Sequence, residues 1–164
     1  MKPRSIVFLQ VVIVLIAVAA LLFLVRAPLT EGRAKNLDLP AIYLDPLILF
    51  GYVSSIAFFV ALYKTFILLG YIKQNEIFSA KPVKALRSIR QCAIILGILI
   101  VLAATYIRLF HAKEDDPAGV LALSIIAVFI TVVVATAAAV FEHILKTGTA
   151  IKTENEQLHQ QLKK

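Results

Sequence analysis

Four long stretches without a charged side chain fill most of this chain of 164 residues. They are Ser5–Val25, Pro46–Tyr63, Gln91–Ile107 and Pro117–Phe141, with 21, 18, 17 and 25 residues. A helix needs about 20 mostly apolar residues to cross the hydrocarbon core of a bilayer. The sequence therefore predicts an all-α, polytopic membrane protein, a bundle of four transmembrane helices at about residues 5–25, 46–72, 88–108 and 117–142.

The composition leaves no room for a separate soluble domain. Hydrophobic residues make up 60% of the chain and charged residues 16%, which lies outside the usual range of soluble proteins. We expect one membrane domain over residues 1–146 and a polar tail over residues 147–164. The first apolar stretch continues past Ala17-Val18-Ala19, which imitates a signal-peptide cleavage site, so an uncleaved first span is expected.

The basic residues are unevenly divided between the two sides of the predicted bundle. Eleven of the 17 lie before the first span, between the second and third, or after the fourth: Lys2, Arg4, Lys73, Lys81, Lys84, Arg87, Arg90, Lys146, Lys152, Lys163 and Lys164. The other two connections hold five basic residues beside six acidic ones. Because positively charged connections stay in the cytoplasm, we expect both termini to be cytoplasmic.

The formal charge of +7 raises the question of nucleic acid as a partner. For a protein with several spans, orientation and attraction to anionic headgroups explain the same charge. The expected partners are therefore the lipid bilayer and its anionic headgroups, and no direct contact with nucleic acid is expected.

Proline and aspartate mark the expected helix starts on the outer side. Asp45-Pro46 precedes the second span and Asp116-Pro117 precedes the fourth. Aspartate accepts hydrogen bonds from free N–H groups at a helix start, and proline in the first turn loses no hydrogen bond. We expect irregular structure in the longer outer connection, residues 26–45, and a tight turn over residues 108–116.

The inner connection is polar from Lys73 onward and ends at Pro82, from which a helix should run into the third span. The first turns of that helix are predicted to be amphipathic. One side carries Val83, Leu86 and Ile89, and a neighbouring face carries Lys84 and Arg87.

Small residues recur four positions apart within the spans: Ala57 and Ala61, Ala93 and Gly97, and Thr131, Ala135 and Ala139. Lipid gives helices no hydrophobic reason to associate, so close backbone approach at small residues is a common packing device. The pattern favours a helical bundle without fixing which helices pair.

Apolar residues recur every seven positions along the polar tail, at Ile144, Ile151 and Leu158, with Gly148, Asn155 and Leu162 between them. This spacing resembles a short coiled-coil seam, which would make the protein a homo-oligomer. Thr147-Gly148-Thr149 is expected to interrupt the seam.

Lys64 is the one charged residue that lies well inside a predicted span rather than near its end. An ionisable side chain in a span is by default a functional candidate. Gln10 and Glu142 are the candidate polar partners of Lys64 within the membrane. We favour the interpretation that Lys64 lies at the inner boundary and extends its ammonium group into water. That position requires the following segment, residues 65–72, to pack on another element.

Enzymatic chemistry is not expected. No serine or cysteine nucleophile stands beside a base, and no glycine-rich phosphate loop is present. The single cysteine, Cys92, excludes an intramolecular disulfide and a multi-thiolate zinc site within one chain. His111 lies near the acidic run from Glu114 to Asp116, which we interpret as a solvated turn rather than a metal site. We expect no cofactor.

Three segments resemble a known bacterial family: Ile72–Arg90 in the inner connection, Glu114–Ala118, and Ile151–Glu156 after the last span. The family is the four-span membrane group known as domain of unknown function 2975. Asn75 stands where that family usually has glycine, and the tail continues as Gln157-Leu158-His159 where the family tends to end in an apolar segment. The resemblance implies a multi-pass protein of the bacterial cell (inner) membrane. Family members are often encoded beside helix-turn-helix regulators, which implies a cytoplasmic regulator as a partner.

These patterns favour a regulatory or partner-binding membrane protein that acts through its cytoplasmic face. The candidate residues for binding the partner are Lys81, Lys84, Arg87 and Arg90. The alternative is a small transporter or channel component with Lys64 beside a polar path. The scarcity of polar residues within the spans argues against that alternative.

Overall fold

The computed structural model describes residues 3–30, 46–74, 76–110 and 118–163. These residues form four α-helices and no strand: α1 (Pro3–Thr30), α3 (Pro46–Lys73), α4 (Ala80–Phe110) and α5 (Ala118–Leu162). All four helices are long and apolar enough to cross a membrane. The prediction of an all-α bundle with four spans is confirmed.

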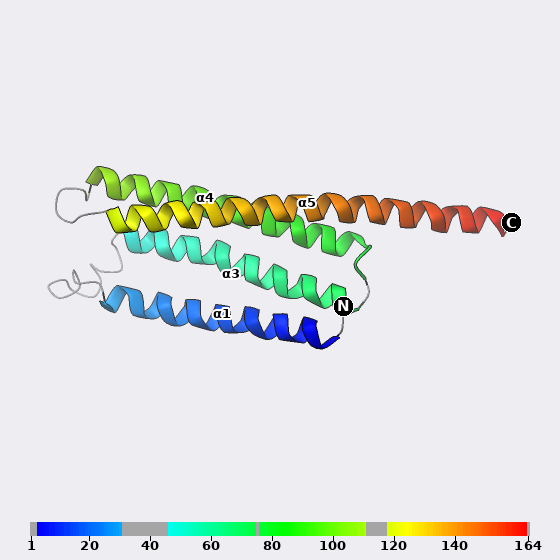
Figure 1. The fold of residues 1–164 in the computed structure, drawn as a ribbon, viewed down its shortest axis with the longest axis horizontal. Coiled ribbons are helices and arrows are strands. Elements are labelled where there is room, and N and C mark those ends of the chain that lie inside the picture. The colour runs from blue at the N-terminus through cyan, green and yellow to red at the C-terminus, as the bar shows by residue number, and fades with distance from the viewer. Residues whose placement is uncertain (1–2, 31–45, 75, 111–117, 164) are drawn as a thin grey trace.

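Neighbouring helices in the sequence are neighbours in the bundle and run antiparallel (Figure 1). α1 packs on α3, α3 on α4, and α4 on α5. Consequently α1 begins, α3 gives way to α4, and α5 ends on the same side of the bundle (Figure 1). We call this side the tail end.

α5 is much longer than the helix beside it. Its 45 residues span about 67 Å, whereas the 31 residues of α4 span about 46 Å. The last turns of α5 therefore extend past every other helix at the tail end (Figure 1). The helix continues through Thr147-Gly148-Thr149, the segment expected to interrupt the coiled-coil seam. The hydroxyl groups of Thr147 and Thr149 donate to the carbonyls of His143 and Leu145, one turn earlier, so they do not compete with the helix.

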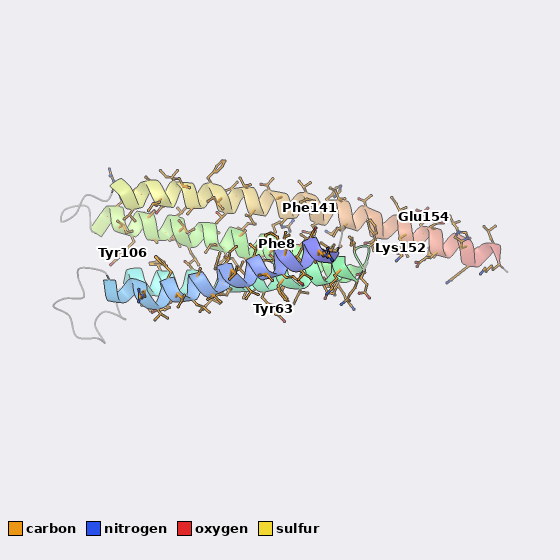
Figure 2. The ribbon with its side chains drawn as sticks, turned by 60° about the horizontal axis from the view of Figure 1, so that its bottom comes forward. Phe8, Tyr63, Tyr106, Phe141, Lys152 and Glu154 are labelled. Carbon is orange, nitrogen blue, oxygen red and sulfur yellow. The ribbon has the colours of Figure 1, made fainter. Side chains whose placement is uncertain are left out.

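The buried core is small and lies toward the tail end. Leu86 and Ile89 of α4 pack with Ala138 of α5, and Leu68 of α3 and Leu145 of α5 cover them. Most other apolar side chains point outward along the helices (Figure 2). A bilayer covers such side chains with hydrocarbon, so their exposure is expected of a membrane protein.

The start of α4 is built as its sequence predicts. Pro82, in the first turn, is fully buried, and Val83, Leu86 and Ile89 are buried on the inner side of the helix. Lys84 and Arg87, on the neighbouring face, are exposed. The predicted amphipathic entry is therefore confirmed. The expected aspartate caps lie outside the described residues, as do residues 31–45 and 111–117 of the two outer connections. The bounds predicted for these connections were wrong at their starts, because residues 26–30 and 108–110 are the last turns of α1 and α4.

Candidate functional site

Among the described residues, Glu142 is the one buried acidic side chain. Its side chain is only 3% exposed. It lies about 36 Å along α5 from Ala118, which is beyond a hydrocarbon core about 30 Å thick. An ionised carboxylate that loses its water must be paired with cations or hydrogen-bond donors.

Three cations surround this carboxylate. The Nε of Arg87 donates a hydrogen bond to Oε1 over 3.2 Å, and the Nζ of Lys146 lies 2.9 Å from the same oxygen. The Nη1 of Arg90 lies 3.1 Å from Oε2, without the alignment of a hydrogen bond. Three positive charges on one carboxylate leave a net charge of +2. We call these four residues the Glu142 cluster.

The local structure explains why the cluster forms. Arg87 and Arg90 are three positions apart and so lie one turn apart on α4. Lys146 follows Glu142 by one turn of α5. The adjacent core of Leu86, Ile89 and Ala138 holds the two helices together at this height. The Glu142 cluster thus ties the start of α4 to the root of the projecting part of α5.

The predicted partnership of Lys64 with Gln10 or Glu142 does not occur among the described residues. Glu142 is taken by cations of α4 and α5, and Gln10 lies half-buried on α1 without a hydrogen bond to Lys64. Lys64 lies about 27 Å along α3 from Pro46, close to the thickness of a hydrocarbon core. Beyond it Leu69 is buried and Leu68 packs on the core, so the segment after Lys64 is covered by other helices.

Lys64 instead shares a hollow with two of the partner-binding candidates. The hollow, between α3 and α4, has a volume of about 190 Å³. It is lined by Lys64, Ile67, Tyr71, Lys81, Lys84, Ala85 and Ser88. The four candidates are therefore divided: Arg87 and Arg90 belong to the Glu142 cluster, and Lys81 and Lys84 line this hollow.

A second contact fixes the α3–α4 connection to α5. A Cβ atom added to Gly148 would lie 2.5 Å from Cε1 and 2.6 Å from Cδ1 of Phe78. Only glycine lets the ring approach the helix this closely. Phe78 lies between α3 and α4, so the contact joins that connection to α5 just beyond the Glu142 cluster.

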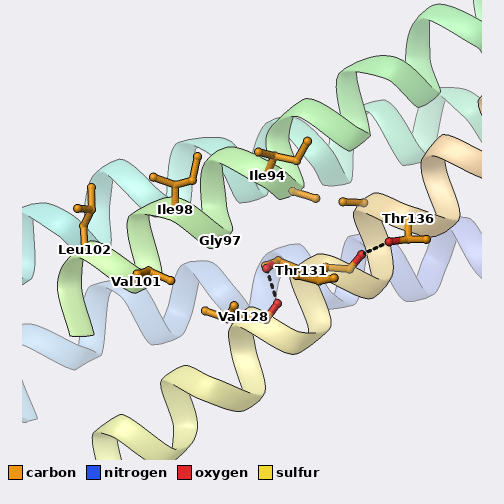
Figure 3. A pocket seen from close by; sticks show the side chains of 11 residues that line it. Ile94, Gly97, Ile98, Val101, Leu102, Val128, Thr131 and Thr136 are labelled. Atoms are coloured by element: carbon orange, nitrogen blue, oxygen red, sulfur yellow. Dashed lines mark hydrogen bonds between the residues drawn. The ribbon is translucent and has the colours of Figure 1, made fainter. Parts of the chain in front are cut away.

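α4 and α5 approach each other closely at small residues within the membrane-spanning part. A Cβ atom added to Gly97 would lie 2.8 Å from Oγ1 of Thr131, whose hydroxyl donates to the carbonyl of Val128 (Figure 3). Ala93 and Thr131 are buried here, while Ala135 is half-buried. The predicted role of these small residues in helix packing is confirmed, and the pair is α4 with α5. An open pocket of about 450 Å³, lined by Gly97, Thr131 and mostly apolar neighbours, lies over the contact (Figure 3).

The sequence offered some signals for the Glu142 cluster. Glu142 was a candidate as a polar residue at the end of a span, and Arg87 and Arg90 were candidates for binding another protein. The sequence does not show that α4 and α5 pair at a height that brings Glu142 beside Arg87 and Arg90. The contact of Phe78 with Gly148 had no comparable signal. Within the described ranges, no three histidine, cysteine or acidic side chains gather as a metal site would require.

Comparisons with known proteins agree on one family. A sequence model described as "Protein of unknown function (DUF2975)" matches residues 30–157. The chain is also similar to the "Uncharacterized membrane protein YoaS" of Bacillus subtilis (strain 168), with 34% identity over 158 residues. That alignment covers 95% of this chain and 98% of the relative. No solved structure matches.

Proposed function

Because the chain belongs to the DUF2975 family of membrane proteins, whose function is unknown, we propose its role from its own geometry: it binds a cytoplasmic regulator through the projecting part of α5. The proposal places the tail end in the cytoplasm of a bacterial cell. The uneven division of basic residues in the sequence supports that orientation.

The observation that carries the proposal is apolar surface where no membrane covers it. Ile151, Leu158 and Leu162 are 61%, 52% and 84% exposed on α5. Their spacing of seven and four positions puts them on one stripe of the helix. Leu162 lies about 30 Å beyond Glu142 along the helix axis, well past the hydrocarbon core. An apolar stripe in water is typical of a surface that another protein covers.

The rest of the tail suits such a surface. Asn155 lies between the apolar residues of the stripe, and Lys152 and Glu154 flank it on the projecting helix (Figure 2). A polar residue within an apolar seam specifies register, and flanking charges select the partner. The Glu142 cluster and the contact of Phe78 with Gly148 brace the root of this helix, so it is held at a fixed direction from the membrane.

Transport is the competing function, and the spans give it little support. The hydroxyl groups of Thr65, Thr105 and Ser124 donate to carbonyls of their own helices. Hydroxyl groups engaged in this way are not arranged along a shared polar path. The pockets between α4 and α5 are lined mainly by apolar side chains.

Two double variants with equal charge test the proposal. Ile151→Glu with Leu158→Glu places two charges on the apolar stripe, whereas Thr153→Glu with Gln160→Glu places two charges seven positions apart on the opposite face. Both proteins would be purified from their native membranes with bound proteins. We expect only the first variant to lose a stoichiometric soluble partner.

Three results would count against the proposal. Equal loss in both variants would show that charge alone drives the association. A self-association that Ile151→Glu with Leu158→Glu abolishes, with no other protein bound, would make the stripe a seam between two copies. Solute or ion flux in vesicles that is unaffected by either variant would favour transport.

A further inference from the structure

Three lysines, Lys64, Lys81 and Lys84, line the hollow between α3 and α4. Lys81 and Lys84 are neighbours three positions apart on α4, and the packing of α3 on α4 brings Lys64 to them. Tyr71 and Ser88 contribute hydroxyl groups to the same lining, while Ile67 and Ala85 contribute apolar surface. The hollow is thus basic on its polar side and apolar elsewhere.

The positive charge of the hollow is hardly neutralised within the chain. No acidic side chain lines it. Glu142 belongs to a different cluster, and Glu76 lies 3.9 Å from Lys81 with both side chains largely exposed. An exposed pair at this distance contributes little. Among the described residues, the ammonium groups of Lys64 and Lys84 form no ion pair, so no described acidic side chain neutralises them.

The height of the hollow matches that of lipid headgroups. Lys64 lies about 27 Å along α3 from Pro46, and Ser88 lies about 33 Å along α4 from Phe110. A hydrocarbon core about 30 Å thick that begins near Pro46 and Phe110 therefore ends within the hollow. The lysines are then level with the phosphate groups of the leaflet at the tail end.

We propose that this hollow is a binding site for the phosphate group of an anionic phospholipid. A phosphate group has several acceptor oxygens, and the three lysines offer ammonium donors around it. Ile67 and Ala85 form an apolar part of the wall of the hollow. Basic pockets between helices at the membrane surface bind anionic headgroups in this way. The site is separate from the apolar stripe on α5, so this proposal does not depend on the binding of a regulator.

The test compares single lysine variants that remove the same charge. Lys64→Gln and Lys84→Gln act on the hollow, while Lys73→Gln removes an exposed lysine at the end of α3 that does not line it. Lys84 is exposed, so its replacement leaves the packing of α4 intact. Each protein would be purified in neutral detergent and titrated with phosphatidylglycerol or phosphatidylcholine. Native mass spectrometry would count bound lipid, and thermal unfolding would report stabilisation.

We expect one phosphatidylglycerol per chain to bind tightly and to raise the unfolding temperature, while phosphatidylcholine has a much smaller effect. Lys64→Gln and Lys84→Gln should each weaken this binding about tenfold or more, the loss typical of a charged hydrogen bond. Lys73→Gln should bind as the wild type does. Equal weakening by all three variants would show diffuse attraction to the surface and overturn the proposal. Equal protection by glycerol phosphate or inorganic phosphate would overturn its assignment to a lipid.

Discussion

The Nε of Arg87 on α4 donates a hydrogen bond over 3.2 Å to the carboxylate of Glu142 on α5, 55 positions later in the chain. This bond links two helices at the tail end of the bundle. It joins the start of α4 to the root of the projecting part of α5. Arg90 and Lys146 add two more cations to the same carboxylate. The stability of the tail end should therefore depend on one acidic residue.

Glu142→Gln should destabilise the protein by about 1–3 kcal/mol, because three cations then lose the charge that holds them together. Their partial exposure to solvent keeps the cost below that of a fully buried cluster. The measurement is thermal unfolding in neutral detergent. Glu156→Gln is the matched control, since Glu156 is exposed and lies 4.0 Å from Lys152. Indistinguishable unfolding of the two variants would mean that the cluster contributes nothing.

Gly97→Ala should weaken the contact between α4 and α5, because the new methyl group would lie 2.8 Å from Oγ1 of Thr131. Overpacking of this kind costs about 1–3 kcal/mol. Thr131→Ala removes that oxygen and leaves the two Cβ atoms 3.6 Å apart, an ordinary contact. The double variant should therefore recover stability. Gly51→Ala meets nothing within 4 Å and serves as the control. The prediction fails if Thr131→Ala gives no recovery.

Gly148→Ala should loosen the α3–α4 connection by displacing the ring of Phe78. In a Phe78→Ala background the same change has no ring to displace, so the higher helix propensity of alanine should stabilise the helix by about 0.5–1 kcal/mol. Amide hydrogen exchange of the connection and of α5 separates the two effects. An identical response to Gly148→Ala in both backgrounds would contradict a role for the contact.

The sequence predicts the helices far better than their contacts. The four uncharged stretches require four spans, and the spacing of Val83, Leu86 and Ile89 predicts the buried side of the start of α4. Hydrophobic length, by contrast, does not say which helices pair or at what height. The partners of Glu142 and the approach of Phe78 to Gly148 depend on that height. For the same reason the sequence does not show that Lys64 lies beside Lys81 and Lys84 rather than beside Gln10 or Glu142.

The seven-residue pattern of the tail was also only partly informative. It predicts a stripe of Ile151, Leu158 and their neighbours, and the structure places them on one helix. The interruption expected at Thr147-Gly148-Thr149 concerns the apolar seam and not the helix. The segment is helical, its threonine hydroxyls donate to the preceding turn, and its glycine makes room for an aromatic ring.

The division of basic residues predicts which side of the membrane each connection faces. Single cysteines at Lys35 and Lys113, in a background in which Cys92 is replaced by alanine, should react with an impermeant thiol reagent added to intact cells. A cysteine at Lys84 should react only after the membrane is opened. Labelling at position 84 in intact cells would reverse the predicted orientation.

The most direct test of the proposed regulator is site-specific photo-crosslinking from the projecting helix in living cells. A photoreactive residue would replace Ile151 or Leu158 on the apolar stripe, and Thr153 or Gln160 on the opposite face. We predict a discrete adduct with one soluble protein from positions 151 and 158, and little or none from positions 153 and 160. The same adduct yield from both faces, or adducts with lipid alone, would contradict the proposal that this stripe binds a cytoplasmic partner.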